Sequence, residues 1–313
     1  MFKHYQGVVL SSLLFLTACN DSKEENVIVP VTTNSLAQAA AAVIASHTLF
    51  DTVLTEHTNT IEEVAVEKGS ASIACGTSVN AGSFLLTLKT ETTYPKDGVL
   101  MNHNCQEGGE TFNGKLDYSC LDNNCDTGNS VATVLSWTHP AIVSFEPVVT
   151  GVWTWKLNNS KQFEDEFKGE VTIKKANLST KFVFGDGVKR VFVGKNTFDV
   201  QGKLDVSQGN SVNCVDGAVS YQSTQSLTMA SGGQRLTGGV MTISNSLGET
   251  GVVTFNADGS LKVSKNGVET VVPKADFESY CGLKEAYGLS EMIESAWLGV
   301  YINYQVKIQK GKV

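Results

Sequence analysis

The stretch that decides the fold is residues 251–272, GVVTFNADGSLKVSKNGVETVV. Asp258-Gly259 separates its first two apolar runs, and Asn266-Gly267 separates the second run from the third. Asp-Gly and Asn-Gly are the residue pairs that tight hairpin turns prefer, because such turns need positive φ angles. Each run is short and rich in valine, which favours a strand. The stretch therefore predicts three consecutive antiparallel strands.

The same pattern recurs along most of the chain. Alternating or β-rich runs predict strands at residues 84–89, 131–137, 148–157, 171–174 and 300–309. Asp186-Gly187 lies between TKFVF and VKRVFV, and we expect it to form another hairpin turn. From about residue 61 onward the pattern is that of strands joined by short turns.

One segment near the N-terminus has a helical period instead. Its apolar side recurs at steps of three and four residues, and Asn34 or Ser35 can cap its start. We expect a helix over residues 35–58 that packs its apolar face on the sheet. A second, short amphipathic helix is expected near residues 289–297. The periodic residues of the first helix are Leu36, Ala40, Val43, His47, Phe50 and Leu54.

These elements predict a mainly β fold, with one large antiparallel β domain over residues 59–313 and the helix packed on it. A half-barrel is the first expectation and a two-sheet sandwich the second. A helix followed by a long meander is similar to the half-barrels of lipoprotein-carrier proteins. That resemblance lies in the order of the elements, and it implies an apolar cavity for a lipid or another small amphiphile.

The composition excludes several classes of protein. The chain has 313 residues, of which 41% are hydrophobic and 18% are charged, so it is long and apolar enough to fold around a core. Its net charge is −8, whereas a general nucleic-acid binder carries a basic face. We therefore expect no nucleic-acid partner.

The N-terminus resembles an export signal. An apolar run from Val8 to Leu16 follows Lys3, and it is too short to span a bilayer. The residues after it, Leu16-Thr17-Ala18-Cys19, resemble the lipobox of bacterial lipoproteins. The resemblance implies that residues 1–18 are removed and that Cys19 receives diacylglycerol and an amide-linked acyl chain such as palmitate. Residues 19–34 would then be the lipidated cysteine and a flexible tether.

The residues after Cys19 bear on the membrane in which the protein resides. In Gram-negative lipoproteins, Asp directly after the cysteine often retains the protein in the inner membrane. Here that position is Asn20, and Asp21 comes one place later. The resemblance therefore implies a Gram-negative outer-membrane lipoprotein, and it leaves undecided which leaflet of that membrane carries the domain.

The remaining six cysteines suggest disulfide bonds, because an exported chain meets an oxidising compartment. Cys120 and Cys125 are close enough to close a small loop, but Cys105 could equally pair with Cys120 across a hairpin. The short motif Asn-Cys-x-acid-Gly occurs twice, and Cys-Gly also occurs twice. A duplicated β unit is therefore kept as an alternative interpretation of the sequence. The six are Cys75, Cys105, Cys120, Cys125, Cys214 and Cys281.

Candidate metal sites are few. Asp122, Asn124 and Asp126 place oxygen atoms at alternate positions, as the start of a calcium loop does. The glycine comes one place late, however, and Thr133 stands where a calcium loop has Glu, so a structural turn is preferred. The histidines show no metal-binding spacing, and we expect neither a metal nor another cofactor.

No catalytic residue is identified, because the sequence lacks a nucleophile motif and a phosphate-binding loop. Three tryptophans, Trp137, Trp153 and Trp155, are candidates for a binding surface, with core packing as the alternative. We expect a non-catalytic binding or interaction role. The partner is either a small apolar ligand or a protein or glycan at the cell surface, and a hydrolase without a recognisable motif is the weaker alternative.

Overall fold

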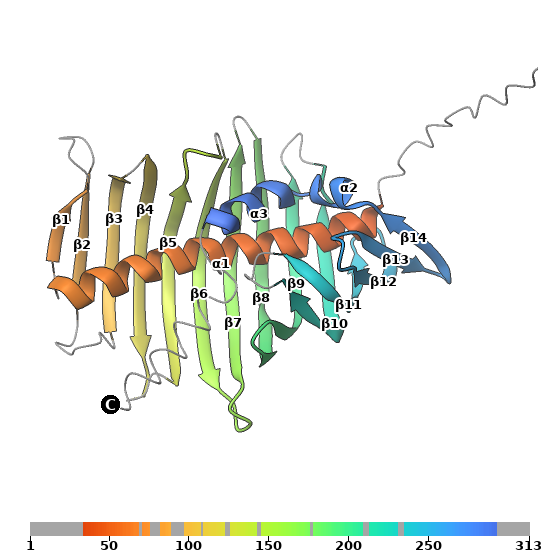
Figure 1. The fold of residues 1–313 in the computed structure, drawn as a ribbon, viewed down its shortest axis with the longest axis horizontal. Coiled ribbons are helices and arrows are strands. Elements are labelled where there is room, and N and C mark those ends of the chain that lie inside the picture. Colours follow the sequence, from red (N-terminus) through yellow and green to blue (C-terminus); the bar gives the residue numbers. More distant parts are fainter. Residues whose placement is uncertain are drawn as a thin grey trace, which may run out of the picture. The chain divides into compact units, whose positions relative to one another are not determined.

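The sheet has fourteen strands in sequence order, and every neighbouring pair is antiparallel. The computed structural model describes residues 34–68, 71–75, 82–88, 97–107, 109–122, 126–142, 145–175, 178–208, 213–230 and 235–292. The strands are β1 (Ala71–Ala74), β2 (Ser83–Leu88), β3 (Asp97–Glu107), β4 (Glu110–Cys120), β5 (Thr127–Thr138), β6 (Phe145–Leu157), β7 (Phe163–Lys175), β8 (Leu178–Gly194), β9 (Thr197–Gln208), β10 (Gly217–Met229), β11 (Leu236–Asn245), β12 (Thr250–Phe255), β13 (Leu261–Lys265) and β14 (Val268–Val272). β1 and β14 are the two edges, so the predicted large antiparallel sheet is confirmed, as one open sheet rather than a sandwich (Figure 1).

The meander at residues 251–272 is also confirmed. Asn266 and Gly267 join β13 to β14 with φ angles of 53° and 80°, as a two-residue hairpin requires. Gly259, with a φ angle of 84°, lies in the turn between β12 and β13.

The hairpin expected at Asp186-Gly187 is wrong. β8 runs without a turn from Leu178 to Gly194, and its pairing with β9 shifts register between Val183 and Val188. Gly187 has a φ angle of 85° inside this irregular stretch. A β-bulge can need the same positive φ angle as a hairpin turn, so the Asp-Gly signal marks a bulge here.

The predicted helix is confirmed at its start but not at its end. α1 (Ser35–Lys68) begins where the side chain of Asn34 caps it, with the Ala37 N–H donating to Asn34 Oδ1 at 3.2 Å. It continues through residues 61–68, where strands were expected. That segment, IEEVAVEK, contains good helix formers and no breaker before Gly69. In Figure 1 the helix lies across the strands, on the face that we call the inner face of the sheet.

Over residues 36–55, α1 is buried all round, rather than on one face only. Ala37 and the alanines of 39–42 have no exposed surface, and their small side chains let neighbouring elements approach closely. Residues Ser35–Thr58 have the length and hydropathy of a membrane span, yet their side chains are covered by the rest of the chain. This helix therefore occupies the inner face of the sheet and forms the centre of the core.

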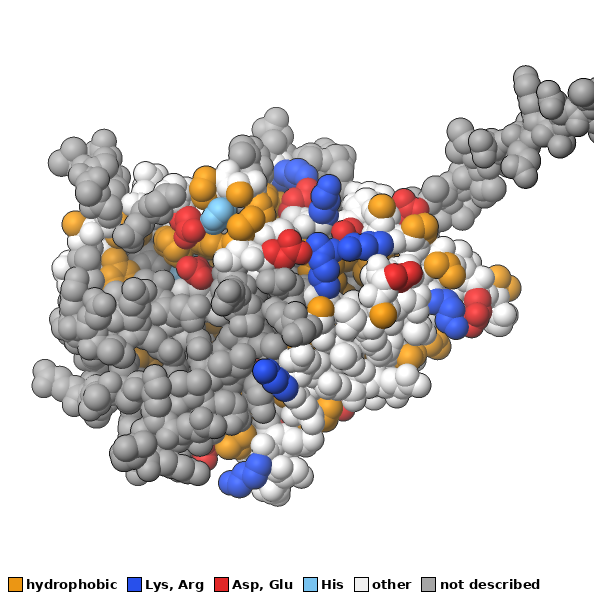
Figure 2. All heavy atoms as spheres, in the orientation of Figure 1, with side chains coloured by type: hydrophobic (Ala, Val, Ile, Leu, Met, Phe, Trp, Pro, Cys, Tyr) orange, Lys and Arg blue, Asp and Glu red, His pale blue; other side chains and the backbone are white. Residues whose placement is uncertain are grey.

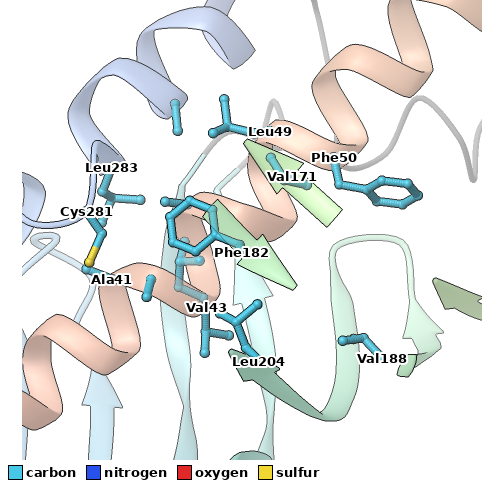
Figure 3. Packing of buried hydrophobic residues seen from close by; sticks show 14 of the residues in the cluster. Ala41, Val43, Leu49, Phe50, Val171, Phe182, Val188, Leu204, Cys281 and Leu283 are labelled. Atoms are coloured by element: carbon cyan, nitrogen blue, oxygen red, sulfur yellow. The ribbon is translucent and has the colours of Figure 1, made fainter. Parts of the chain in front are cut away.

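Two shorter helices follow the sheet. α2 (Lys274–Glu278) was not predicted, and α3 (Leu283–Met292) begins six residues before the helix expected at 289–297. Residues 293–313, with the strand predicted at 300–309, lie outside the described residues. Figure 3 shows side chains from α1, from the sheet and from α3 in one apolar cluster, including Val43, Phe182 and Leu283.

Disulfide bonds are confirmed for two cysteine pairs. Cys75–Cys105 joins the end of β1 to β3, and Cys214–Cys281 joins the segment before β10 to the α2–α3 connection. Each bond links one Asn-Cys-x-acid-Gly motif to one Cys-Gly motif. A Cys105–Cys120 bond is therefore excluded. Cys120 is itself disulfide-bonded, and Cys125 lies outside the described residues.

Candidate functional site

A pocket of about 730 Å³ lies over β5–β10 on the outer face of the sheet, opposite α1. Its lining includes exposed outward side chains and the neighbouring residues, which point into the core. We call this pocket the outer trough. It is defined by Asn129, Thr154, Lys156, Glu164, Glu166, Lys189, Val191, Asp199, Gln201 and residues 222–226.

The floor of the outer trough is one row of polar side chains. The strand register places one outward residue from each of six neighbouring strands in line across the sheet. Side chains that lie in register on one face are neighbours about 5 Å apart. The row therefore presents closely spaced hydrogen-bonding groups in the order Asn129, Thr154, Glu166, Lys189, Gln201 and Gln222.

A bulge in β10 borders one side of the row. Gln222 pairs with Gln201 and Leu227 pairs with Phe198, so four residues of β10 face only two residues of β9. The Val200 N–H donates to Ser223 Oγ at 3.0 Å, which fixes the start of the bulge. Bulges often lie next to functional sites because they redirect side chains.

The charges of the outer trough are nearly balanced. Glu164, Glu166 and Asp199 are acidic, and Lys156 and Lys189 are basic. Lys156 Nζ lies 3.2 Å from Glu164 Oε2. A hydrogen bond from the Asn158 side chain and the nearby Lys156 hold the pKa of Glu164 below its usual value. The trough therefore offers donors and acceptors rather than a field of one sign.

Beneath the trough lies a buried ionic network. Arg190 on β8 donates from Nε to Asp165 Oδ1 at 2.9 Å and from Nη1 to Asp51 Oδ2 of α1 at 2.5 Å. Trp153 Nε1 donates to Asp165 Oδ2 at 3.1 Å. All four side chains are buried, so this network fixes α1 against the strands that form the trough floor.

Burial shifts the proton affinities in this network. It raises the pKa of Asp51 to about 6, against the opposing effect of Arg190. Asp51 Oδ1 has no hydrogen-bond partner within the described part of the chain. Burial lowers the pKa of Arg190, but the charges of Asp165 and Asp51 outweigh it and raise the pKa above its usual value.

Burial favours the neutral form of two histidines of α1, of which His47 lies near Arg190 and His57 lies against β4. His47 Nε2 and the Tyr221 hydroxyl are 2.8 Å apart, and burial together with Arg190 lowers the pKa of His47 well below its usual value. Burial also lowers the pKa of His57, whose Nδ1 lies 2.8 Å from the Val53 carbonyl oxygen. His47, one of the predicted apolar-face residues, is thus a core residue.

The three tryptophans do not form a surface. The exposed fractions of Trp137, Trp153 and Trp155 are 1%, 9% and 7%. Trp153 and Trp155 point inward from β6 with ring centroids 4.5 Å apart, and a side chain on Gly128 would collide with the Trp155 ring. Of the two roles that the sequence left open, the exposed binding surface is therefore excluded, and core packing is the role that the structure shows.

The calcium candidates are described only in part. The Asp126 N–H donates to Asp122 Oδ1 at 3.0 Å, so this carboxylate closes a turn, while Asn124 lies outside the described residues. Among the residues that the structure describes, no group of three or more His, Cys, Asp or Glu side chains could hold a metal ion. Cys19 also lies outside the described residues, and its lipidation stays a prediction.

The opposite face also carries ion pairs, and they join the helices to the sheet. Figure 2 shows this face with basic and acidic side chains side by side. Arg235 pairs with Glu278 and Glu291, and its guanidinium lies 4.8 Å from the ring centroid of Tyr287. Lys175 pairs with Glu285 of α3. These pairs join the helices to the sheet, so the outer trough is the stronger candidate site.

Sequence reasoning missed the outer trough. The signal was present as alternation, since Thr154 and Lys156 flank Trp155, and Glu164 and Glu166 flank Asp165. The row, however, depends on the register of six strands. Comparison of the chain with family models, with curated proteins and with solved structures finds no match.

Proposed function

We propose that this chain is a lipid-anchored protein of the Gram-negative envelope that binds a partner in the outer trough without catalysis. The anchor is the acylated Cys19 at the end of Leu16-Thr17-Ala18-Cys19, and the position of Asn20 favours the outer membrane. Several acyl chains hold a membrane far better than one does. The folded domain follows the tether that ends at residue 34.

The observation that carries the binding role is the outer trough itself. Its volume of about 730 Å³ is that of a typical ligand site. Its side chains protrude from a rigid sheet whose other face is packed against α1, so the site is preorganised. The hydrogen bond from Asn158 and the paired Lys156 stabilise the Glu164 carboxylate in its ionised form, which suits recognition better than acid catalysis.

A protein partner at the cell surface is the second candidate. Val131 and Val152 lie opposite each other on the outer face of β5 and β6, next to the trough, and both are exposed. Exposed apolar residues beside a polar site are typical of protein interfaces. A small apolar ligand is a weaker candidate, because α1 occupies the inner face where a lipid cavity was expected.

The anchor is tested by labelling cells with an alkyne analogue of palmitate. We expect the full chain to incorporate the label and the Cys19→Ala variant to lose it. Incorporation of label into the Cys19→Ala variant would contradict the assignment of the anchor.

The trough is tested by sedimentation with isolated Gram-negative cell-wall sacculi. The full chain, solubilised in detergent, should sediment with the sacculi, and the double variant Gln201→Ala/Gln222→Ala should not. Gln208→Ala is the matched control, because Gln208 is an exposed glutamine of β9 outside the trough. Equal sedimentation of the double variant and the control would contradict a binding role of the trough.

A further inference from the structure

We infer that the ligand of the outer trough is an uncharged oligosaccharide that lies along the row from Asn129 to Gln222. The inference rests on the proposed function and names the chemical class of the partner. It is carried by the dimensions of the row, by the kinds of groups in it and by its charge.

The row suits a linear chain of repeated polar units. It crosses six strands, and five steps of strand spacing give a length of roughly 24 Å. The bulged residues Ser223–Ser226 of β10 border the row, so that the site is a trough rather than a flat face. An extended oligosaccharide of several units fits such a site, whereas a compact metabolite would contact only part of it.

The side chains of the row match hydroxyl and amide groups. The Asn129, Gln201 and Gln222 amides each offer donors and acceptors, and the Thr154 hydroxyl offers both. Glu166 adds an acceptor and Lys189 adds donors. Sugars present hydroxyls that donate and accept, so each unit can form hydrogen bonds with the side chains of neighbouring strands.

The charge and polarity of the trough disfavour other ligands. Three carboxylates beside two lysines do not form the basic surface that a phosphate-rich or other polyanionic chain requires. An amphiphile or a protein hot spot needs exposed apolar or aromatic anchors. The Trp155 side chain is buried, and Leu121 at the margin is the one exposed large apolar side chain in the lining.

The test is titration calorimetry of the full chain in detergent. The probes are two uncharged series, chito-oligosaccharides and malto-oligosaccharides, each from disaccharide to hexasaccharide. We expect binding that strengthens with chain length in at least one series. The chito series tests N-acetylated sugars, as in cell walls, and the malto series tests plain glucans.

The variants locate the site. Loss of one hydrogen bond costs about fivefold in affinity, so Gln201→Ala and Gln222→Ala should each weaken binding by about that factor. Gln208→Ala is the control for the two glutamine variants, and Lys181→Ala is the control for Lys189→Ala on the same strand, β8. Both control variants should leave the affinity unchanged. Binding that is equally strong in all variants would overturn the inference.

The outcomes separate this inference from the proposed function. If neither series binds but Gln201→Ala/Gln222→Ala still abolishes sedimentation with sacculi, the ligand class is wrong and the binding role stands. If protease treatment of the sacculi abolishes that sedimentation, the partner is a protein and the inference is overturned. If neither oligosaccharides nor sacculi bind, both proposals fail.

Discussion

Arg190 on β8 and Asp51 on α1 meet in the core although 139 residues separate them, with Nη1 2.5 Å from Oδ2. Asp165 on β7 holds the other side of the same guanidinium. A buried ion pair does little for stability relative to apolar packing, but it fixes which residues face each other. Together with the His47–Tyr221 contact, the pair therefore fixes the position of α1 along a mostly apolar inner face of the sheet.

The first prediction concerns this network. Arg190→Met leaves two carboxylates buried without their counterion, so we expect the free energy of unfolding to fall by about 3–5 kcal/mol. Urea unfolding followed by circular dichroism measures it. The triple variant Asp51→Asn/Arg190→Met/Asp165→Asn removes the charges together and should recover part of the loss. A loss below about 1 kcal/mol in Arg190→Met is typical of exposed ion pairs, and it would contradict the burial of this network.

The second prediction concerns pH. Burial lowers the pKa of His47, so its contribution to stability is present above pH 6.5 and is lost as the pH falls and the unfolded chain takes up a proton. The raised pKa of Asp51 acts oppositely, since its contribution is present below pH 3.8 and is lost as the pH rises through about 6. The two groups therefore give opposite slopes of stability against pH.

Two variants test these signs, with unfolding measured at about pH 7.5 and about pH 5. His47→Gln should reduce the loss of unfolding free energy on acidification by about 2 kcal/mol. Asp51→Asn should increase that loss, because a group that gains a proton in the folded state has been removed. Unchanged slopes in both variants would show that neither group is buried in the way described.

The sequence predicted elements better than their connections. The meander at 251–272 and the start of α1 were predictable because turn and cap residues act locally. Asp186-Gly187 misled because a bulge and a hairpin can need the same backbone angle at glycine. The sequence did not decide whether the three tryptophans are exposed or buried, because only the strand register shows which face of the sheet each one occupies.

The third prediction concerns Gly169, which lies opposite Gly151 where β6 and β7 approach closely. A Cβ atom on Gly169 would lie 2.1 Å from the Thr150 carbonyl oxygen, so backbone has to move. We expect Gly169→Ala to destabilise the fold by about 1–3 kcal/mol or more. Gly185→Ala is the control, because nothing lies within 4 Å of its added Cβ. Thermal unfolding compares the two, and equal midpoints would contradict the close approach.

The fourth prediction concerns the disulfide bond that holds α2 and α3 to the sheet. Cys214–Cys281 spans 67 residues and both cysteines are buried, so Cys214→Ala/Cys281→Ala should cost about 2–4 kcal/mol. Cys75–Cys105 spans 30 residues near the edge of the sheet, and its removal should cost less. Urea unfolding without reductant compares the stability lost on removal of each bond. A larger loss for Cys75–Cys105 than for Cys214–Cys281 would contradict the view that the second bond matters more for the core.

The outer trough lies beyond sequence reasoning for a physical reason. Each polar residue in its row looks like an ordinary solvated position of its own strand. Only the register of six strands, with the bulge in β10, brings Asn129 and Gln222 into one site. The Arg190 network was hidden for the same reason, since its two carboxylates come from a helix and from a neighbouring strand.

The most direct test of the trough is hydrogen–deuterium exchange of the full chain in detergent. The probe is the soluble fragment mixture released from sacculi by muramidase. We predict slower exchange in peptides that cover Lys189, Gln201 and Ser223–Ser226, and unchanged exchange in peptides that cover α2 and α3. Protection confined to α2 and α3 would contradict the claim that the outer trough is the binding site, and no protection at any concentration would contradict a cell-wall glycan as its partner.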